Sequence, residues 1–495
     1  MPPENSGSLV FVGGRVVDPA SGLDAVTPVE IADGRVRSIG AVPATEATVL
    51  DVTGMTIAPG FIDLHSHGQS VSSMQMQALD GVTTALELEA GVSPVAMAYR
   101  LAANEGRPIN YGFSASWAGV RMRVLGGIDI GASVQALLSG LGRPAWKQPA
   151  SERELATVVE HLEIELGAGA LGIGVLAGYA PETTREEYIE IARLARRHDV
   201  PTFTHARYKN QTGDSRTAYD GIAEIVEAAR GTGAHMHVCH VNSTSLRAID
   251  DVHAAVEKAL AEGHRVTTEG YPYGAGMTAV AAPFLHPDNL PLLGIGPQNI
   301  VVARTGERIA SAERLLELRG TTPGEAVIAH YLDEGEADDR DVMRRALIFP
   351  DTAVASDAIG FVTASGAAAT GWPLPSDARS HPRSAGTFAR FWRTMVRETG
   401  ALSDAEAIRR LTQVPADILA SVSPDMRRKG TLSVGSDADV VVFDPTAFTD
   451  RATYASPNQA SSGMRHVLVG GEFVVRDNEM LPEARPGRAV RGAIR

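Results

Sequence analysis

The central part of this chain alternates strand-like with helix-like segments, and this alternation restricts the fold more than any other feature. Apolar, β-branched runs are separated by stretches such as 151–166 and 185–198, in which apolar residues recur every three or four positions. That order is typical of an α/β protein with a parallel sheet. We predict strands at residues 61–65, 83–89, 109–115, 171–175, 201–205, 235–240, 265–270 and 352–356. Eight such strands predict a closed (β/α)8 barrel of the TIM type.

The two ends of the chain share a different pattern, in which short alternating runs are broken by Gly, Asp and Pro. Asp33-Gly34 separates two of these runs and predicts a hairpin. Similar runs return near the C-terminus, at 439–443, 466–475 and 487–491. Because each end alone would have little core, we predict one small β-sandwich domain built from residues 1–59 and 425–495, with the barrel in residues 60–424.

The segment 271–351, between the seventh and eighth predicted strands, is too long for a simple connection. It is rich in Pro and Gly around 283–297 and charged around 333–345. We therefore predict that it forms an insertion, or lid, over the mouth of the barrel.

Composition limits the class of protein and its partners. A chain of 495 residues with 44% hydrophobic and 21% charged residues has the composition of a soluble globular protein with a large core. Its formal net charge of −14 argues against a nucleic-acid partner. The single cysteine, Cys239, excludes an internal disulfide and fits a reducing compartment.

The sequence also lacks the signs of export or membrane insertion. The first eight residues do not resemble a signal peptide, and no apolar run approaches the ~20 residues of a membrane span. We expect a cytoplasmic protein that acts on a small molecule and does not bind a membrane. A homo-oligomer remains open.

A His-x-His pair at His65 and His67 follows the apolar run 60–64 and is the strongest chemical signal. Side chains at i and i+2 of a strand point the same way, so both imidazoles can bind one metal ion. A surface or core role is an equally good reading of the pair alone, so distant residues must decide.

Three further polar residues end apolar runs: His205, His240 and Asp357. Each alone fits a buried polar group. Together with the His-x-His pair they are what a metal-dependent hydrolase needs at the carboxyl ends of barrel strands. Imidazoles would hold the ion, and the carboxylate would take the proton from metal-bound water as it attacks.

An ordered series of motifs resembles the amidohydrolase superfamily, and within it the N-acyl-D-amino-acid deacylases, or D-aminoacylases. It comprises PGFIDLHSH at 59–67, GVTTALELEAG at 81–91, GALGIGVLAGYAP at 169–181, FTHAR at 203–207, VCHVNS at 238–243, GYPYGAG at 270–276, VASDAIG at 354–360, HPRSAGTF at 381–388 and KGTLSVGSDADVVVFDP at 429–445. The first two motifs further resemble the D-glutamate deacylases.

The resemblance implies a two-position metal site. His65 and His67 would bind one metal, His205 and His240 the other, and Asp357 would act as general base or acid. The implied cofactor is Zn²⁺, as one or two ions.

The chain departs from this family where a cysteine ligand usually follows the second strand. That position is Ala90 here, and the fourth strand has no lysine of the kind that is carboxylated in other branches. We predict that Glu89 completes the site, with Glu87 as second choice; the alternative is that both acids belong to a buried hydrogen-bond network. A carboxylate in place of a thiolate would also admit Mn²⁺ or Fe²⁺.

For the substrate, the resemblance implies that Arg383 and Tyr271 hold the carboxylate of the amino acid, since a guanidinium pairs bidentately with that group. Asn242 stands where the family usually has a lysine and is expected among the substrate contacts. Arg207 and Arg121 either bind an acidic side chain or pair with neighbouring carboxylates.

The predicted function is hydrolysis of the amide bond of N-acyl-D-amino acids, N-acyl-D-glutamate among them. The alternatives are a cyclic amidase or another C–N hydrolase, and a scaffold that has lost its chemistry. From strand parity, His235, His237 and Cys239 are expected to face the surrounding helices, opposite to His240.

Overall fold

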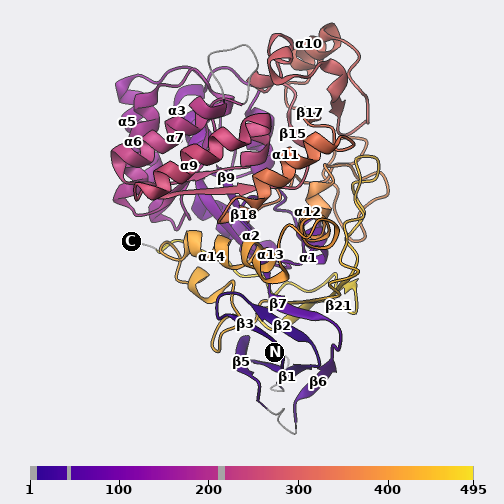
Figure 1. Ribbon diagram of the computed structural model, residues 1–495. Coiled ribbons are helices and arrows are strands. Elements are labelled where there is room, and N and C mark those ends of the chain that lie inside the picture. Colours follow the sequence, from indigo (N-terminus) through magenta and orange to yellow (C-terminus); the bar gives the residue numbers. More distant parts are fainter. Residues whose placement is uncertain (1–7, 42–45, 210–217, 494–495) are drawn as a thin grey trace.

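In the computed structural model, which describes residues 8–41, 46–209 and 218–493, a barrel of strands and helices lies against two smaller β-sheets (Figure 1). All eight predicted barrel strands form one parallel sheet in the order β18-β14-β13-β12-β11-β10-β9-β8. These strands are β8 (Phe61–Asp63), β9 (Val82–Val92), β10 (Asn110–Ser116), β11 (Ile173–Leu176), β12 (Pro201–His205), β13 (His235–Val238), β14 (Val266–Gly270) and β18 (Thr352–Val354). The prediction of the (β/α)8 architecture is confirmed.

The barrel closes beyond the ends of its first and last strands. β8 and β18 share no ladder, but Ser66 and Ala358 form a parallel bridge, and the Asp357 amide donates to the His65 carbonyl at 2.7 Å. The segments that close the barrel are therefore those that carry predicted site residues.

Helices cover the outside of the barrel and continue after its last strand. They are α1 (Val71–Leu79), α2 (Val95–Glu105), α3 (Trp117–Gly126), α4 (Val134–Gly140), α5 (Glu152–Gly167), α6 (Arg185–Arg197), α7 (Ala218–Thr232), α8 (Val241–Ser245), α9 (Ile249–Ala261), α12 (Arg383–Trp392), α13 (Asp404–Leu411) and α14 (Gln413–Leu419). None of the helices in the described ranges is both long and apolar enough to cross a membrane.

Both termini contribute to the β-sandwich below the barrel (Figure 1). One sheet has the order β5-β4-β1-β6 and the other β22-β21-β20-β19-β7-β2-β3. Their strands are β1 (Leu9–Val12), β2 (Arg15–Asp18), β3 (Leu23–Val26), β4 (Val29–Ala32), β5 (Arg35–Ile39), β6 (Thr48–Asp51), β7 (Thr56–Pro59), β19 (Val440–Phe443), β20 (Met464–Val469), β21 (Glu472–Arg476) and β22 (Glu479–Met480). Phe11 and Ile31 of one sheet pack against Ile57 and Val440 of the other in a shared core.

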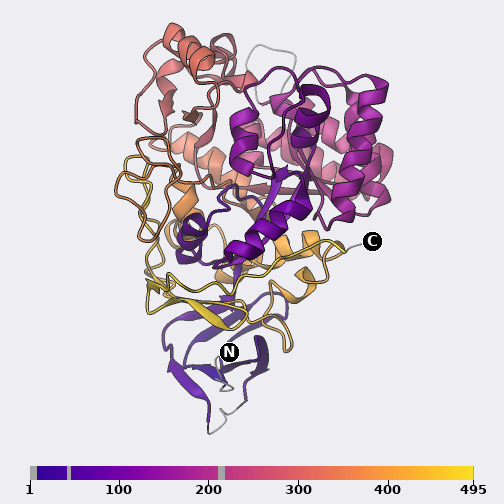
Figure 2. The same cartoon turned by 180° about the vertical axis from the view of Figure 1, so that it is seen from behind.

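Two local predictions at the termini have different outcomes. Asp33 and Gly34 both have positive φ, 52° and 72°, and join β4 to β5 as the predicted hairpin turn. The run 487–491, in contrast, was expected to belong to the sandwich but does not join it. Val490 donates to the Tyr111 carbonyl at 2.7 Å, so this run pairs with β10, and the C-terminal segment crosses between barrel and sandwich (Figure 2).

The segment between β14 and β18 contains a small sheet and a barrel helix. An antiparallel sheet of order β15-β17-β16 is built from β15 (Ala275–Ala279), β16 (Ile300–Val302) and β17 (Ala326–His330), with α10 (Ala312–Thr321) between the last two strands. α11 (Ala337–Ile348) then packs against β14 and β18. The inserted part therefore ends before α11, which serves as the helix between the last two barrel strands.

A buried ion-pair cluster joins the barrel to the sandwich. The Lys429 ammonium lies 2.6 Å from Asp439 and 3.0 Å from Asp437, and Asn110 of β10 donates to the same Asp439 oxygen at 2.9 Å. Lys429 and Asp439 are each 6% exposed. Because burial removes water from these charges, each depends on the other for stabilisation.

We expect Lys429→Met to lower the free energy of unfolding by about 3–5 kcal/mol, because it leaves the buried Asp439 carboxylate without its cation, whereas Asp437 keeps Arg35 and Arg428. Chemical denaturation would measure the change. Arg314→Met is the matched control, since Arg314 pairs with Glu307 at the surface and such pairs contribute about 0–1 kcal/mol. Equal effects of the two substitutions would contradict the structural role of the cluster.

Candidate metal centre and substrate cavity

The predicted metal ligands come from four strand ends and meet at one place. His65 and His67 follow β8, Glu89 lies near the end of β9, His205 ends β12, and His240 lies two residues beyond β13. All five side chains are buried. The carboxyl ends of barrel strands converge, so residues far apart in sequence become neighbours.

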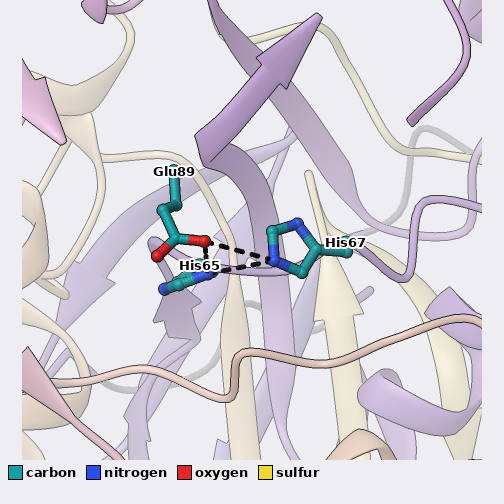
Figure 3. A group of neighbouring side chains, drawn as sticks. All are labelled: His65, His67 and Glu89. Atoms are coloured by element: carbon teal, nitrogen blue, oxygen red, sulfur yellow. Dashed lines mark hydrogen bonds and ion pairs between the residues drawn. The ribbon is translucent and has the colours of Figure 1, made fainter. Parts of the chain in front are cut away.

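The Glu89 carboxylate lies between two pairs of imidazoles. Its Oε2 is 3.2 Å from His65 Nε2 and 3.6 Å from His67 Nε2, as Figure 3 shows from the side of the His-x-His pair. Its Oε1 is 3.0 Å from His205 Nδ1 and 2.7 Å from His240 Nε2. One carboxylate therefore faces both predicted metal positions, and each half of the site is a group of three donors within 4.8 Å of one another.

His240 reaches this site by a local backbone irregularity. β13 ends at Val238, and His240 has a φ of 34°, in the left-handed region that few non-glycine residues adopt. The prediction from strand parity is therefore wrong for His237. Its Nε2 lies 3.1 Å from Glu269, whose other oxygen is 2.5 Å from His65 Nδ1, so His237 faces the site and not the helices.

Cys239 also lies on the site side of the barrel. Its sulfur is within 4.8 Å of donor atoms of His65 and Glu269. Burial and the neighbouring acids raise the pKa of the thiol well above its usual value, which keeps it protonated. The expectation from strand parity that Cys239 faces the helices is therefore also wrong.

Two acids orient the ligands of the His-x-His pair from behind. Glu87 Oε2 is 2.7 Å from His67 Nδ1, and Glu269 Oε1 holds His65 Nδ1. Such partners fix the orientation of a metal-binding imidazole and the nitrogen that it offers. Glu87, the second choice as a ligand, thus contacts His67, which is itself a predicted ligand. Sequence reasoning missed Glu269, although a glutamate inside a buried strand was a signal for it.

A β-bulge places Glu89 in the centre. Phe113 of β10 pairs with Glu87, but Ala115 pairs with Val92, so extra residues of β9 lie opposite one residue of β10. Glu87 Oε1 accepts the amides of Ala90 and Gly91 at 3.2 Å and holds this bulge. Bulges next to active sites redirect side chains in this way.

The charges of the cluster fit a cation. Burial lowers the pKa of an imidazole, but the neighbouring acids outweigh it and raise the pKa of His65 and His67 well above the usual value. Burial lowers the pKa of His205 to about 4, so this ring is neutral. Burial raises the pKa of Glu89, yet His65 and the other imidazoles hold it well below its usual range. A divalent ion on these nitrogen and oxygen donors would balance the buried negative charge.

Asp357 lies beside the His-x-His pair. Its Oδ1 is 3.5 Å from His65 Nε2, 3.4 Å from His67 Nε2 and 2.9 Å from Arg383 Nη2. Its backbone has a φ of 51°, held by its amide bond to His65 and by the Arg383 Nε donating to its carbonyl at 2.7 Å. Burial raises the pKa of Asp357, but Arg383 and His65 hold it well below its usual range.

The structure brings Arg383 and Tyr271 together near the metal centre. The guanidinium of Arg383, 1% exposed, lies over the Tyr271 ring at 4.7 Å from its centroid. Its Nη1 has no hydrogen-bond partner in the described part of the chain. A buried donor without a partner is costly and indicates a ligand that would accept from it.

The other three predicted substrate residues have different surroundings. The Oδ1 atom of Asn242 accepts a hydrogen bond from the Tyr271 amide at 3.2 Å, so this side chain supports the backbone after β14. Arg207 pairs with Glu224 and donates to two carbonyls, and Arg121 pairs with Glu187. For both arginines the structure thus shows the second of the two predicted roles, in which the guanidinium pairs with a neighbouring carboxylate.

A cavity opens in front of the metal centre and is walled by the insertion. One side is formed by ligands, Asp357 and Tyr271, and the other by residues of mixed character, which include Leu138, Leu141, Tyr179, Lys209, Ser243, Gly276, Met277, Thr278, Phe284, Ala326 and Tyr331. Sequence reasoning missed Lys209, because a lone lysine in a loop carries no signal of burial.

Comparison with known proteins identifies the family of this chain. A sequence model of the amidohydrolase family matches residues 48–475. The chain belongs to this family. It is 29% identical to an N-acyl-D-glutamate deacylase of Alcaligenes xylosoxydans xylosoxydans over 98% of this chain and 96% of that protein, and 26% identical to a D-aminoacylase of the same organism over 94% and 93%.

A solved structure extends the likeness to the fold. The N-acyl-D-glutamate deacylase of Bordetella bronchiseptica, complexed with zinc and a phosphonate inhibitor that mimics the tetrahedral intermediate, superimposes with a TM-score of 0.77 at 22% identity. The match covers 98% of this chain and 100% of that chain. Barrel, insertion and terminal sheets thus form one arrangement shared along the whole length.

Glu89 and Glu87 are distinguishable by substitution. Glu89→Gln keeps the shape of the side chain but removes the charge that faces four imidazoles, so we expect metal affinity to fall by more than about 100-fold. Glu87→Gln, which changes only a partner of His67, should cost about 10- to 100-fold. Metal content after dialysis at graded free-metal concentrations measures both. A larger loss for Glu87→Gln would assign the ligand role to Glu87.

Proposed function

We propose that this protein is a metal-dependent hydrolase that cleaves the amide bond of N-acyl-D-amino acids, giving a carboxylate and a free amino acid. The observation that carries the proposal is the Glu89-centred donor set, with Asp357 beside it and an unpartnered Arg383 donor near the same cavity. Full-length similarity to enzymes named as deacylases of N-acyl-D-amino acids supports the choice of substrate.

His65, His67, Glu89, His205 and His240 are the proposed ligands of one or two divalent ions, with Zn²⁺ first and Mn²⁺ or Fe²⁺ as alternatives. Zinc in the related deacylase from Bordetella bronchiseptica supports this order. When bound, such an ion polarises the substrate carbonyl and activates water for attack.

The protein side chains then have separable tasks. Asp357 takes a proton from the attacking water and passes it to the departing nitrogen, a transfer for which its low pKa keeps it in the required ionised form. Glu87 and Glu269 keep the rings of His67 and His65 in place. Tyr271 and Arg383 hold the carboxylate of the amino acid.

Two features separate this proposal from its alternatives. Many cyclic amides carry no free carboxylate, so the Arg383 Nη1 donor, which lacks a partner in the described chain, favours an N-acyl amino acid over them. An inactive scaffold has no need for five convergent ligands with Asp357 beside them. N-acyl-D-glutamate is the first side-chain class to test, since an N-acyl-D-glutamate deacylase is 29% identical over 98% of this chain.

We also propose the division into a composite sandwich of residues 1–59 and 425–495, from which the run 487–491 departs to pair with β10, and a barrel of 60–424, and we propose a cytoplasmic location. The presence of a single cysteine, Cys239, which is buried, fits a reducing compartment. Limited proteolysis and fractionation would test the two statements.

Metal-reconstituted protein should hydrolyse N-acetyl-D-amino acids, glutamate included, and leave the L forms largely intact. Release of free amine from paired D and L substrates and from five- and six-membered cyclic amides measures this. Turnover of L forms alone would contradict the assignment. Turnover of cyclic amides alone would favour the alternative enzyme, and inactivity without stoichiometric metal would favour the scaffold.

Asp357→Asn should lower kcat by about 10²- to 10⁴-fold, the usual contribution of a general base. The carboxamide keeps the size of the side chain but cannot accept the proton. Steady-state kinetics would measure the loss, with metal content as the control that the centre remains assembled. Full activity of this variant would exclude Asp357 as the base.

A further inference from the structure

Lys209 places a buried ammonium group at the wall of the cavity. The side chain follows β12 and the residue is 6% exposed. Its ammonium donates to the Ser243 carbonyl at 3.3 Å and lies 5.1 Å from the ring centroids of both Phe284 and Tyr331. Among residues 8–41, 46–209 and 218–493, no carboxylate lies within ion-pair distance of it.

The nearby Arg383 differs in this respect. Its guanidinium is already paired with Asp357 at 2.9 Å, so its charge is balanced while its Nη1 keeps a free N–H. Lys209 on the cavity wall thus has no ion-pair partner among the described residues, and Arg383, next to Gly276 of the same wall, has one donor without a partner among them. A ligand that satisfies both must carry one negative charge and more than one acceptor.

The space between these groups is left open by Gly276. A Cβ atom on this residue would lie 3.3 Å from the Tyr271 hydroxyl, 3.4 Å from a Tyr331 ring carbon and 3.9 Å from Arg383 Nη1. The side of Gly276 that lacks a side chain therefore faces the Tyr271 hydroxyl, the Arg383 Nη1 donor and the Tyr331 ring. Lys209 lies over this same ring. A carboxylate at this place would find donors from Arg383 and Tyr271.

We propose that Lys209 forms the ion pair with the α-carboxylate of the N-acyl amino acid, opposite the donors of Arg383 and Tyr271. The inference deepens the proposed function and rests on it. Because the partner is the carboxylate common to all amino acids, Lys209 selects for a free acid and does not choose among side chains. Burial lowers the pKa of Lys209 to about 8, an effect that a bound anion offsets.

Binding to chelator-treated protein tests this apart from turnover. Calorimetry would compare N-acetyl-D-leucine with its carboxamide, which has the same shape without the charge. We expect Lys209→Met to weaken binding of the acid by about 30-fold or more, as for truncation of one partner of a buried charge pair, and to leave the amide nearly unchanged. Lys209→Arg should keep most of the preference for the acid.

Two further variants make the result specific. Lys147→Met is the matched control, because Lys147 also lies over a ring, that of Trp146 at 5.8 Å, but does not line the cavity; acid binding should stay at the wild-type level. Gly276→Ala keeps every charge and fills the space beside Arg383, so it should weaken binding of the acid while Lys209 remains.

The outcomes separate the inference from the proposed function. Wild-type-like binding of the acid by Lys209→Met would overturn the role of Lys209, as would a wild-type protein without preference for the acid. A loss confined to N-acetyl-D-glutamate would also overturn it and assign Lys209 to the side chain. If the acid preference depends on Lys209 but metal-loaded wild type hydrolyses no N-acyl amino acid, the proposed function fails and the carboxylate site stands.

Discussion

The sharing of one buried carboxylate among four imidazoles is the interaction on which the site depends. Glu89 faces His65 and His67 with one oxygen and His205 and His240 with the other. Uncompensated charges are costly in a buried place, so acids and imidazoles must balance one another, and a bound cation would add to this balance. Glu87 and Glu269 contribute to the same charge balance. Each contacts the Nδ1 atom, on the side away from the centre, of His67 and His65 respectively.

The segments that carry the site residues also close the barrel, so the same hydrogen bonds stabilise both the fold and the site. The Asp357 amide bonds to the His65 carbonyl across the seam between the first and last strands, and the Arg383 Nε bonds to the Asp357 carbonyl. A side chain whose own backbone closes the sheet is held in place by the whole barrel. Such preorganisation is what general acid–base chemistry requires, because a proton must pass between atoms at hydrogen-bond distance.

The cavity separates two kinds of recognition. The proposed metal ligands and Asp357 form one end, where an amide would react, while Lys209, Arg383 and Tyr271 surround the place proposed for the carboxylate. Met277, Phe284 and Ala326 of the insertion supply apolar wall. The insertion thus adds substrate contacts to a barrel that supplies the metal centre, as loops beyond barrel strands commonly do.

The sequence by itself determined the barrel strands, the sandwich from both termini and the main donor set, because these depend on local periodicity and on polar residues that end apolar runs. The preference for Glu89 over Glu87 came from the family resemblance, because the position of the absent cysteine is Ala90, next to Glu89. Tertiary structure alone decided how each side chain is used. Parity misplaced His237 because a left-handed residue at His240 turns the chain, and Arg207 and Arg121 proved to be paired by Glu224 and Glu187 from distant helices. Lys209 could be recognised as a candidate for substrate binding only from its burial in the folded structure. Partners and burial arise from contacts between distant segments, which no local pattern contains.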